Sequence, residues 1–128
     1  MSIHSIHHVQ LGFPAGQQAL VRHFYGELLG LKEFRLGGTG NALRFYAASQ
    51  RVDLVPVPDW TPAPATQPSR LAFEVQNLPG FRARLLGAGL QIDETRPLPG
   101  HLRFYVNDPA GNPLEFLEPD LSQGSEAP

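Results

Sequence analysis

The polar and titratable residues of this sequence that could take part in catalysis or binding occupy alternate positions in short, strand-like segments. Successive side chains of a strand point to opposite faces, so alternate polar residues share one face of a sheet. The polar set comprises His8, Gln10, Arg44, Tyr46, Asp53, Arg70, Glu74, His101, Arg103, Tyr105 and Glu115. Imidazole and carboxylate groups can bind a divalent cation, whereas guanidinium groups can hold a carboxylate or a phosphate. The set is consistent with a small-molecule site, and equally with an ordinary solvated sheet face.

The amino-acid composition excludes several kinds of functional site. The 128 residues contain no cysteine, which excludes a thiol nucleophile and a thiolate metal site, so any metal would need His, Asp or Glu. Ten Lys and Arg stand against twelve Asp and Glu, and this net charge of −2 does not indicate a nucleic-acid or membrane surface. No segment has the pattern of a signal peptide or a membrane span. We expect a cytoplasmic protein whose partner is a small molecule.

An internal repeat indicates the fold. The tetrapeptide LRFY occurs twice, and other landmarks recur around it in the same order. The pairs Leu43/Leu102 and Gly30/Gly89 are 59 positions apart, and the pairs His8/Arg70 and Asp53/Glu115 are 62 positions apart. A single shared tetrapeptide could arise by chance, but four landmarks with nearly constant spacing favour a duplicated structural unit.

Each copy of the repeat has the pattern of a strand, a helix and three further strands. The first strands are expected over residues 6–13 and 70–75, and shorter strands around Leu36 and Ile92, at both LRFY strings, and at VDLV and PLEFLE. The residues expected to define the helices are Leu20, Phe24, Leu28 and a capping Gly30 in the first, and Pro79, Phe81, Leu85 and a terminal Gly87 or Gly89 in the second. This predicts an α+β fold of two tandem βαβββ units, whose curled mixed sheets surround a trough and carry the helices on their outer faces.

The boundaries of the units follow from proline content. One domain is expected over residues 1–128, with unit one at about 3–57, unit two at about 69–119 and a frayed tail over 120–128. Between the units, residues 56–68 contain five prolines and are predicted to be an extended connector, not a strand. Trp60, the only tryptophan, lies in this connector and should either cover the mouth of the trough or hold the connector against the body.

Several motifs resemble those of a known superfamily. The opening strand IHHVQLG, the helix end FYGELLGLKE and the closing segment FYVNDPAGNPLEFLE, together with the paired units, resemble the vicinal oxygen chelate superfamily. That group includes glyoxalase I, extradiol dioxygenases, fosfomycin and bleomycin resistance proteins, and methylmalonyl-CoA epimerase. The resemblance spans about residues 6–118, and its motifs are specific for the superfamily but not for one activity.

The resemblance implies four metal-ligand positions, which fall on His8, Asp53, Arg70 and Glu115. Three of these residues suit a divalent Mn, Fe, Ni or Zn ion. Arg70, however, stands where metal-binding relatives have His, and a guanidinium is always protonated and offers no lone pair. Either Arg70 replaces the metal by pairing with Glu115 and Asp53, or Arg70 helps to hold an anionic group of a ligand.

Two functions are therefore considered. The favoured one is metal-independent binding of a small aromatic or polar molecule by a ligand-binding set of Arg70, Arg44, Tyr46, Arg103, Tyr105, Trp60 and Gln10. The alternative is a divalent-metal-dependent lyase, isomerase or dioxygenase, with His8, Asp53 and Glu115 as ligands and with Glu115, Tyr105 and Glu74 as candidate catalytic residues. Tyr46 and Tyr105 could equally be cross-strand packing residues. A homodimer is expected, with each site in one chain or across the interface.

Overall fold

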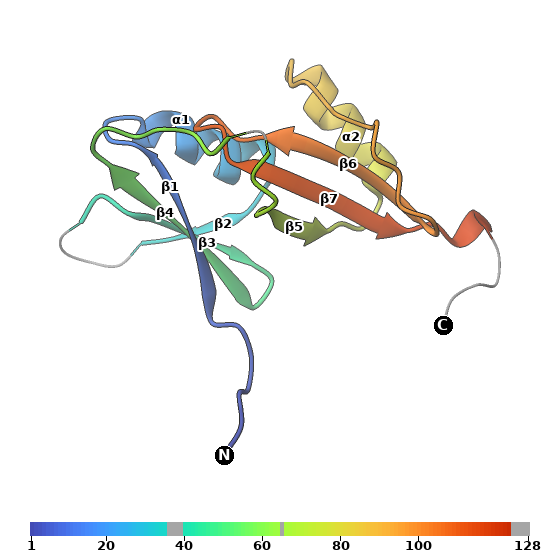
Figure 1. Ribbon diagram of the computed structural model, residues 1–128, viewed down its shortest axis with the longest axis horizontal. Helices are drawn as coiled ribbons and strands as arrows, with labels where there is room; N and C mark the ends of the chain where they lie inside the picture. The colour runs from blue at the N-terminus through green and yellow to red at the C-terminus, as the bar shows by residue number, and fades with distance from the viewer. Residues whose placement is uncertain (36–39, 65, 124–128) are drawn as a thin grey trace. The chain divides into compact units, whose positions relative to one another are not determined.

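Two units, each built on one mixed sheet, make up the part of the chain that the computed structural model describes, residues 1–35, 40–64 and 66–123. The first unit comprises Met1–Ala63 and Pro109–Asn112, and the second comprises Pro64–Asp108 and Pro113–Pro128 (Figure 1). The turn between the last two strands therefore belongs to the first unit. None of the helices among these residues is both long and apolar enough to cross a bilayer.

The first unit has a four-stranded sheet. Its elements are β1 (His8–Pro14), α1 (Gln18–Arg22), the π-helix η1 (His23–Leu28), β2 (Lys32–Phe34), β3 (Leu43–Ala47) and β4 (Gln50–Val57). The strand order is β1-β4-β3-β2, in which β1 and β4 are parallel and the other pairs are antiparallel. Because β4 lies between β1 and β3, its side chains have neighbours on both sides.

The second unit has a three-stranded sheet. Its elements are β5 (Leu71–Glu74), α2 (Leu78–Gly87), β6 (His101–Asn107), β7 (Pro113–Pro119) and the 3₁₀ turn η2 (Leu121–Gln123). The strand order is β5-β7-β6, with β5 parallel and β6 antiparallel to β7. Helix α2 packs on one face through Phe81, whose ring lies 6.4 Å from the ring of Phe104 and 5.2 Å from that of Phe116. The predicted α+β class with two mixed sheets is confirmed.

The apolar strand positions given by the alternation are all covered in the structure. The residues expected to face the helices are all buried or half-buried: Val9, Leu11, Leu43, Phe45, Val52, Leu54, Leu71, Phe73, Leu102, Phe104, Leu114 and Phe116. In the first unit the ring of Tyr25 stacks on Phe45 at 5.7 Å, and in the second the ring of Phe73 stacks on Phe116 at 5.4 Å. Burial of these apolar side chains holds each helix against its sheet.

The first helix buries a different residue from the one expected. Leu20 is 54% exposed, whereas Val21 is fully buried. The spacing that favoured Leu20 assumed a regular α-helix, but the helix continues as η1, in which the N–H of Leu29 donates to the carbonyl of Phe24, five residues earlier. This wider turn places consecutive residues, Phe24 and Tyr25, in the core. Gly30 follows the helix with φ 78°, as expected for a capping glycine.

The second helix agrees with its predicted signals. Pro79 lies in its first turn, and the side-chain oxygen of Asn77 accepts a hydrogen bond from the N–H of Gly80 at 3.3 Å. Leu85 is fully buried. Gly89 has φ 85°, so the chain leaves the helix through a left-handed residue, as the predicted terminal glycine requires.

Two of the predicted short strands, around Leu36 and around Ile92, are not found as predicted among the described residues. Leu36 lies outside the described residues, and β2 runs over Lys32–Phe34. Around Ile92 the described chain forms only a single antiparallel bridge, between Asp93 and Tyr105. The chain turns away there because the Asp93 carboxylate accepts hydrogen bonds from the Thr95 N–H and hydroxyl at 2.9 and 2.6 Å.

The predicted start of the connector is wrong by two residues. Pro56 and Val57 still belong to β4, where they pair with β1. The missing N–H of Pro56 is tolerated because β3 pairs with β4 only as far as Leu54, so one side of the strand is free at Pro56.

An ion pair joins the first helix to the edge strand of its sheet. Arg22 donates from Nε and Nη2 to the two carboxylate oxygens of Glu33 at 2.8 and 3.0 Å. The hydrogen bond from Arg22 lowers the pKa of Glu33 in the folded protein, although partial burial acts in the opposite direction. A lowered folded-state pKa stabilises the fold above the ordinary pKa of glutamate, and this stabilisation is lost as the pH falls through the folded-state value.

Replacing Glu33 by Gln should therefore destabilise the protein in a pH-dependent way. Because Arg22 is partly exposed, we expect a loss of about 1 kcal/mol in the free energy of unfolding near neutral pH. The difference between wild type and Glu33→Gln should shrink as the pH falls from neutral into the acid range, below the ordinary pKa of glutamate, because Glu33 of the folded wild type is then progressively protonated as well. Urea denaturation of both proteins across this pH range measures the difference in the free energy of unfolding. A difference that is independent of pH would contradict the ion pair between Glu33 and Arg22 as its source.

Candidate functional site

Charged side chains surround Asp53 on the polar face of the first sheet. This residue lies on the central strand β4 and is only 5% exposed. Arg51 Nε and Nη2 donate to its two carboxylate oxygens at 2.8 and 3.1 Å. Arg44 Nε and His8 Nε2 each lie 3.9 Å from Asp53 Oδ2. We call these four residues the Asp53 cluster. Both oxygens of the buried carboxylate accept a hydrogen bond from Arg51, and these charge-assisted bonds stabilise its negative charge.

Arg51 was not among the residues singled out from the sequence, although the sequence held a signal for it. Arg51 precedes Asp53 by two positions in the same strand, and alternation places both on one face. The bidentate geometry could not be foreseen, because it depends on the rotamers of both side chains.

Two other predicted residues of the first unit, Gln10 and Tyr46, take no part in the Asp53 cluster. Gln10 is exposed on β1, opposite Asp53 in the sheet register. The ring of Tyr46 lies edge-to-face with that of Phe34, at 5.6 Å between centroids. Such a contact fits the packing alternative for this tyrosine.

Trp60 is held within the first unit. Its indole N–H donates to the carbonyl of Ala110 at 2.9 Å, in the turn that belongs to this unit. Its ring also lies so close to Gly12 that a Cβ built there would be 2.4 Å from Trp60 Cζ3. These contacts fit the alternative in which Trp60 holds the connector to the body.

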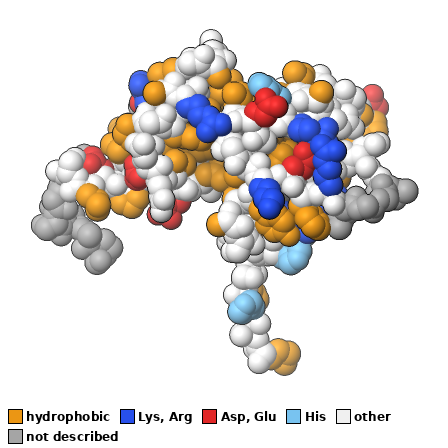
Figure 2. All heavy atoms as spheres, turned by 180° about the vertical axis from the view of Figure 1, so that it is seen from behind, with side chains coloured by type: hydrophobic (Ala, Val, Ile, Leu, Met, Phe, Trp, Pro, Cys, Tyr) orange, Lys and Arg blue, Asp and Glu red, His pale blue; other side chains and the backbone are white. Residues whose placement is uncertain are grey.

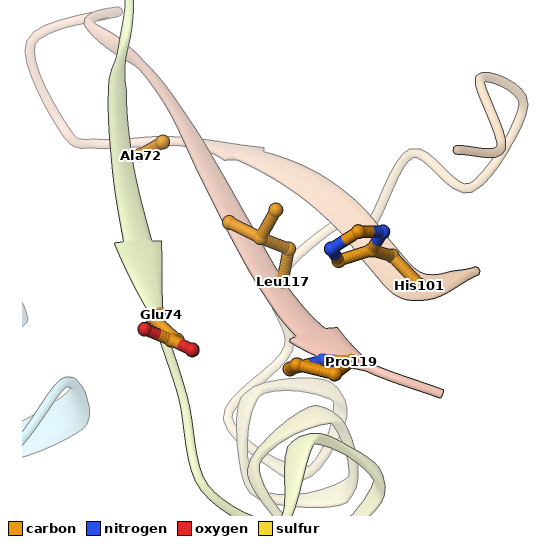
Figure 3. A pocket seen from close by; sticks show the side chains of 5 residues that line it. All are labelled: Ala72, Glu74, His101, Leu117 and Pro119. Atoms are coloured by element: carbon orange, nitrogen blue, oxygen red, sulfur yellow. The ribbon is translucent and has the colours of Figure 1, made fainter. Parts of the chain in front are cut away.

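The polar face of the second sheet has two parts. At one end Glu74, exposed on β5, borders a hollow with four other residues (Figure 3). At the other end three guanidinium groups surround the ring of Tyr105, which is only 7% exposed. The carbon Cζ of Arg96 lies 3.9 Å from the ring centroid, and those of Arg70 and Arg103 lie 5.0 and 5.3 Å from it. We call Tyr105, these three arginines and Glu115 the Tyr105 cluster.

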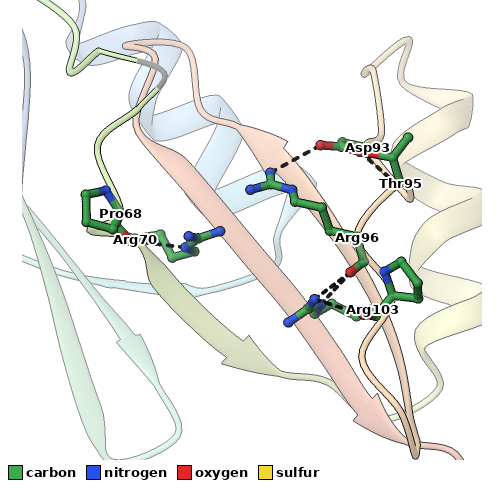
Figure 4. A network of polar contacts seen from close by, with 7 residues as sticks. Pro68, Arg70, Asp93, Thr95, Arg96 and Arg103 are labelled. Carbon is green, nitrogen blue, oxygen red and sulfur yellow. Dashed lines mark hydrogen bonds and ion pairs between the residues drawn. The ribbon is translucent and has the colours of Figure 1, made fainter.

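The three arginines differ in how they are held (Figure 4). Arg103 Nε donates to the carbonyl of Arg96 at 3.0 Å, and Arg103 Nη1 donates to Glu115 at 3.4 Å. Arg96 Nη2 donates to the Asp93 carboxylate at 3.2 Å. Arg70 donates only from Nε, to the carbonyl of Pro68 at 3.3 Å, and has no ion pair within the described ranges. Two of the arginines are therefore paired with carboxylates and the third is not.

Glu115 pairs with Arg103, whereas the sequence had suggested Arg70 as its partner. The register explains this arrangement, since Glu115 lies opposite Tyr105 and Arg103 is two residues earlier on the same face of β6. Arg70 lies just before β5, and its guanidinium is directed over the Tyr105 ring. Arg96 was not foreseen, because it lies in the loop before β6, where alternation gives no information.

Paired charges are also visible on the surface. Figure 2 shows basic side chains lying beside acidic ones on one face of the molecule. Arginine dominates this pairing, because the chain holds a single lysine. The planar guanidinium can donate two parallel hydrogen bonds to one carboxylate, as it does at Asp53 and Glu33.

A metal ion at the predicted ligands would compete with these pairs. The predicted ligands of the first unit are His8 and Asp53, and an ion bound by Asp53 would share its carboxylate oxygens with Arg51. Glu115, in the second unit, would likewise be shared with Arg103. A guanidinium next to a ligand also opposes a cation electrostatically. The shared site of these residues, and the trough expected between the sheets, stay predictions.

Comparisons with known proteins agree with the motifs in the sequence. A family model of the Glyoxalase/Bleomycin resistance protein/Dioxygenase superfamily matches residues 5–116. The chain belongs to this superfamily, as its motifs had indicated. A comparison with curated proteins found none that matches this sequence.

Similar solved structures share the fold over nearly the whole chain. A glyoxalase family protein from Bacillus anthracis is 29% identical, with a TM-score of 0.85 over 94% of this chain and 98% of that chain. The fosfomycin resistance protein FosX from Listeria monocytogenes is 14% identical, with a TM-score of 0.76 over 95% and 97%. A lactoylglutathione lyase from Agrobacterium tumefaciens is 20% identical, with a TM-score of 0.65 over 89% and 92%. At these last two identities the likeness concerns the fold alone.

Proposed function

We propose that this protein binds a small anionic organic molecule at the Tyr105 cluster, without a metal ion. The observation that carries the proposal is the state of Arg70, which lies over the Tyr105 ring and has no carboxylate partner within the described ranges. Three guanidinium groups meet there, whereas the carboxylates bound to them are only Glu115 and Asp93. Together with Asp93, the Tyr105 cluster therefore carries an excess of one positive charge.

The geometry of Arg70 suits a carboxylate or a phosphate. Its Nη1 and Nη2 groups have no hydrogen-bond partner among the described residues, so they are free to donate two parallel bonds to an oxyanion. Arg70 is exposed, which gives a ligand access from solvent. The other two arginines are fixed by their own partners and would supply positive potential without needing to move.

Replacing Arg70 by Ala should weaken the binding of anionic probes. We expect about a tenfold increase in the Kd for benzoate and for inorganic phosphate, because one charge-assisted hydrogen-bonded contact is lost. Titration followed by NMR measures both affinities and shows whether resonances of Tyr105 and Arg103 shift.

The control for this experiment is Arg82→Ala. Arg82 also lies in the second unit, on α2, but its exposed side chain pairs with Glu94 and not with a residue of the Tyr105 cluster. Both variants lose one positive charge, so a general effect of net charge would weaken binding equally in both. Equal affinities of wild type and Arg70→Ala would contradict the proposal.

A divalent-metal enzyme is the second candidate. It is favoured by one contact in the first unit, where His8 Nε2 lies 3.9 Å from Asp53 Oδ2, so that an imidazole and a carboxylate are neighbours. Glu74 and Tyr105 would then be candidates to transfer protons in a lyase, isomerase or dioxygenase reaction.

Metal analysis of protein purified without chelator separates the two candidates. A stoichiometric metal ion that is lost in His8→Ala would overturn metal-independent binding. Metal-free protein that still binds benzoate would eliminate the second candidate. The homodimer and the cytoplasmic location stay predictions, and sedimentation at several protein concentrations tests the first of them.

A further inference from the structure

The hollow on the polar face of the second sheet is not accounted for by the Tyr105 cluster. It has a volume of about 320 Å³ and is lined by Ala72, Glu74, His101, Leu117 and Pro119 (Figure 3). Leu117 and Pro119, on the central strand β7, form its floor, and this floor is apolar because both side chains are apolar. Its two polar groups, Glu74 and His101, come from the strands on either side of β7, so they lie on opposite sides of this floor.

Both polar groups of the hollow have unused hydrogen-bonding capacity. Within the described ranges Glu74 has neither a hydrogen bond nor an ion pair, although its carboxylate can accept several. His101 Nδ1 lies 3.2 Å from the carbonyl of Pro99. A carbonyl oxygen only accepts, so Nδ1 carries the hydrogen of this contact, and in the tautomer with its hydrogen on Nδ1 the other nitrogen, Nε2, is an acceptor. The hollow therefore offers two acceptors to a donor group.

The hollow and the Tyr105 cluster lie on the same face at neighbouring positions. Along β6, His101, Arg103 and Tyr105 alternate onto one face, and Arg103 lies opposite Leu117 in the register. Two residues of a strand span about 7 Å, so His101 lies about 7 Å from Arg103 and about 13 Å from Tyr105 along β6. Leu117 lines the hollow directly beside Arg103, and Ala72 lines it beside Glu115. One small molecule can therefore contact both.

We infer that the ligand is an organic acid with an apolar middle and a hydrogen-bond donor, such as a hydroxyl or an amine, at its far end. The acid group would bind Arg70, the apolar part would cover Leu117, and the donor would reach Glu74 or His101. A second carboxylate at the far end is disfavoured, because it would meet the carboxylate of Glu74. This inference rests on the proposed function, since the position of the acid group sets the direction of the molecule.

Two matched probes test the inference. The probes are 3-phenylpropionate and 3-(4-hydroxyphenyl)propionate, which differ by one hydroxyl group, and isothermal titration calorimetry measures both. In the wild type, the hydroxylated probe should bind about fivefold more tightly, the size expected for one net hydrogen bond. In a Glu74→Ala and His101→Ala double variant, the ratio of the two affinities should fall to about one. The ratio is the readout because the change of net charge affects both probes equally.

The outcomes distinguish this inference from the proposed function. Equal affinities in the wild type, or a preference that persists in the double variant, would overturn the inference alone, provided that Arg70→Ala still weakens both probes. Absence of binding of either probe, or equal binding by Arg70→Ala, would overturn both. Single variants Glu74→Gln and His101→Ala repeat the test if the double variant does not fold, and the hydroxyl preference should fall in at least one of them.

Discussion

Replacing Asp53 by Ala should destabilise the protein by about 2–3 kcal/mol in the free energy of unfolding. The carboxylate is only 5% exposed, and it is the common partner of Arg51, Arg44 and His8. Without it, two guanidinium groups remain close together on the sheet with no opposite charge between them. The cost is the repulsion and desolvation of these cations, which are themselves partly buried.

The same variant distinguishes a structural carboxylate from a metal ligand. If Asp53 served mainly as a metal ligand, the Asp53→Ala variant would be nearly as stable as wild type when both are metal-free. The Asp53 carboxylate would then have no partner charge in the metal-free wild type either. Urea denaturation in the presence of a chelator measures the loss. Glu27→Ala is the control, since Glu27 lies on the helix surface and is 74% exposed, and we expect a change below about 0.5 kcal/mol for it.

A double-mutant cycle gives the coupling between Asp53 and Arg51. The Asp53→Ala and Arg51→Ala variants should together cost clearly less than the sum of the two single losses, because the second substitution removes a cation that the first left unpaired. Strict additivity would contradict the bidentate pair as the source of the stability.

Replacing Gly12 by Ala should have the second-largest effect, a loss of about 2 kcal/mol. A Cβ at residue 12 would lie 2.4 Å from Cζ3 of Trp60, which is nearer than atoms can approach without movement. The indole ring must therefore shift, and its hydrogen bond to the Ala110 carbonyl would be weakened. Because Trp60 is the only tryptophan, its fluorescence emission should move to longer wavelength as the ring becomes more exposed.

Gly87→Ala is the matched control for this prediction. Gly87 is the last residue of α2, and a Cβ there would meet nothing within 4 Å. Alanine also favours a helix over glycine, so we expect an unchanged emission spectrum and a gain of up to about 0.5 kcal/mol. A Gly12→Ala protein with wild-type stability and emission would show that the ring adapts without cost.

Some features of the fold follow from local pattern and were predictable from the sequence. The strands show a two-residue alternation, so their buried faces could be assigned residue by residue from Val9 to Phe116. The second helix carries its own signals in Pro79 and Gly89. The first helix was harder, because its π-helical second half changes the spacing of inward-facing residues, and nothing in the residue types announces that change.

The family, the two repeated units and the residues that share the polar face of each sheet could all be read from the sequence. These properties depend on motifs, spacing and strand alternation, which are local to the chain. The pairing of Asp53 with Arg51, the pairing of Glu115 with Arg103 and the position of Arg96 over Tyr105 became evident only in the folded protein. Such pairings depend on rotamers and on contacts between distant segments. From the sequence alone, several arginines could pair with the same carboxylate equally well. The unpaired state of Arg70, on which the proposed function depends, is of the same kind.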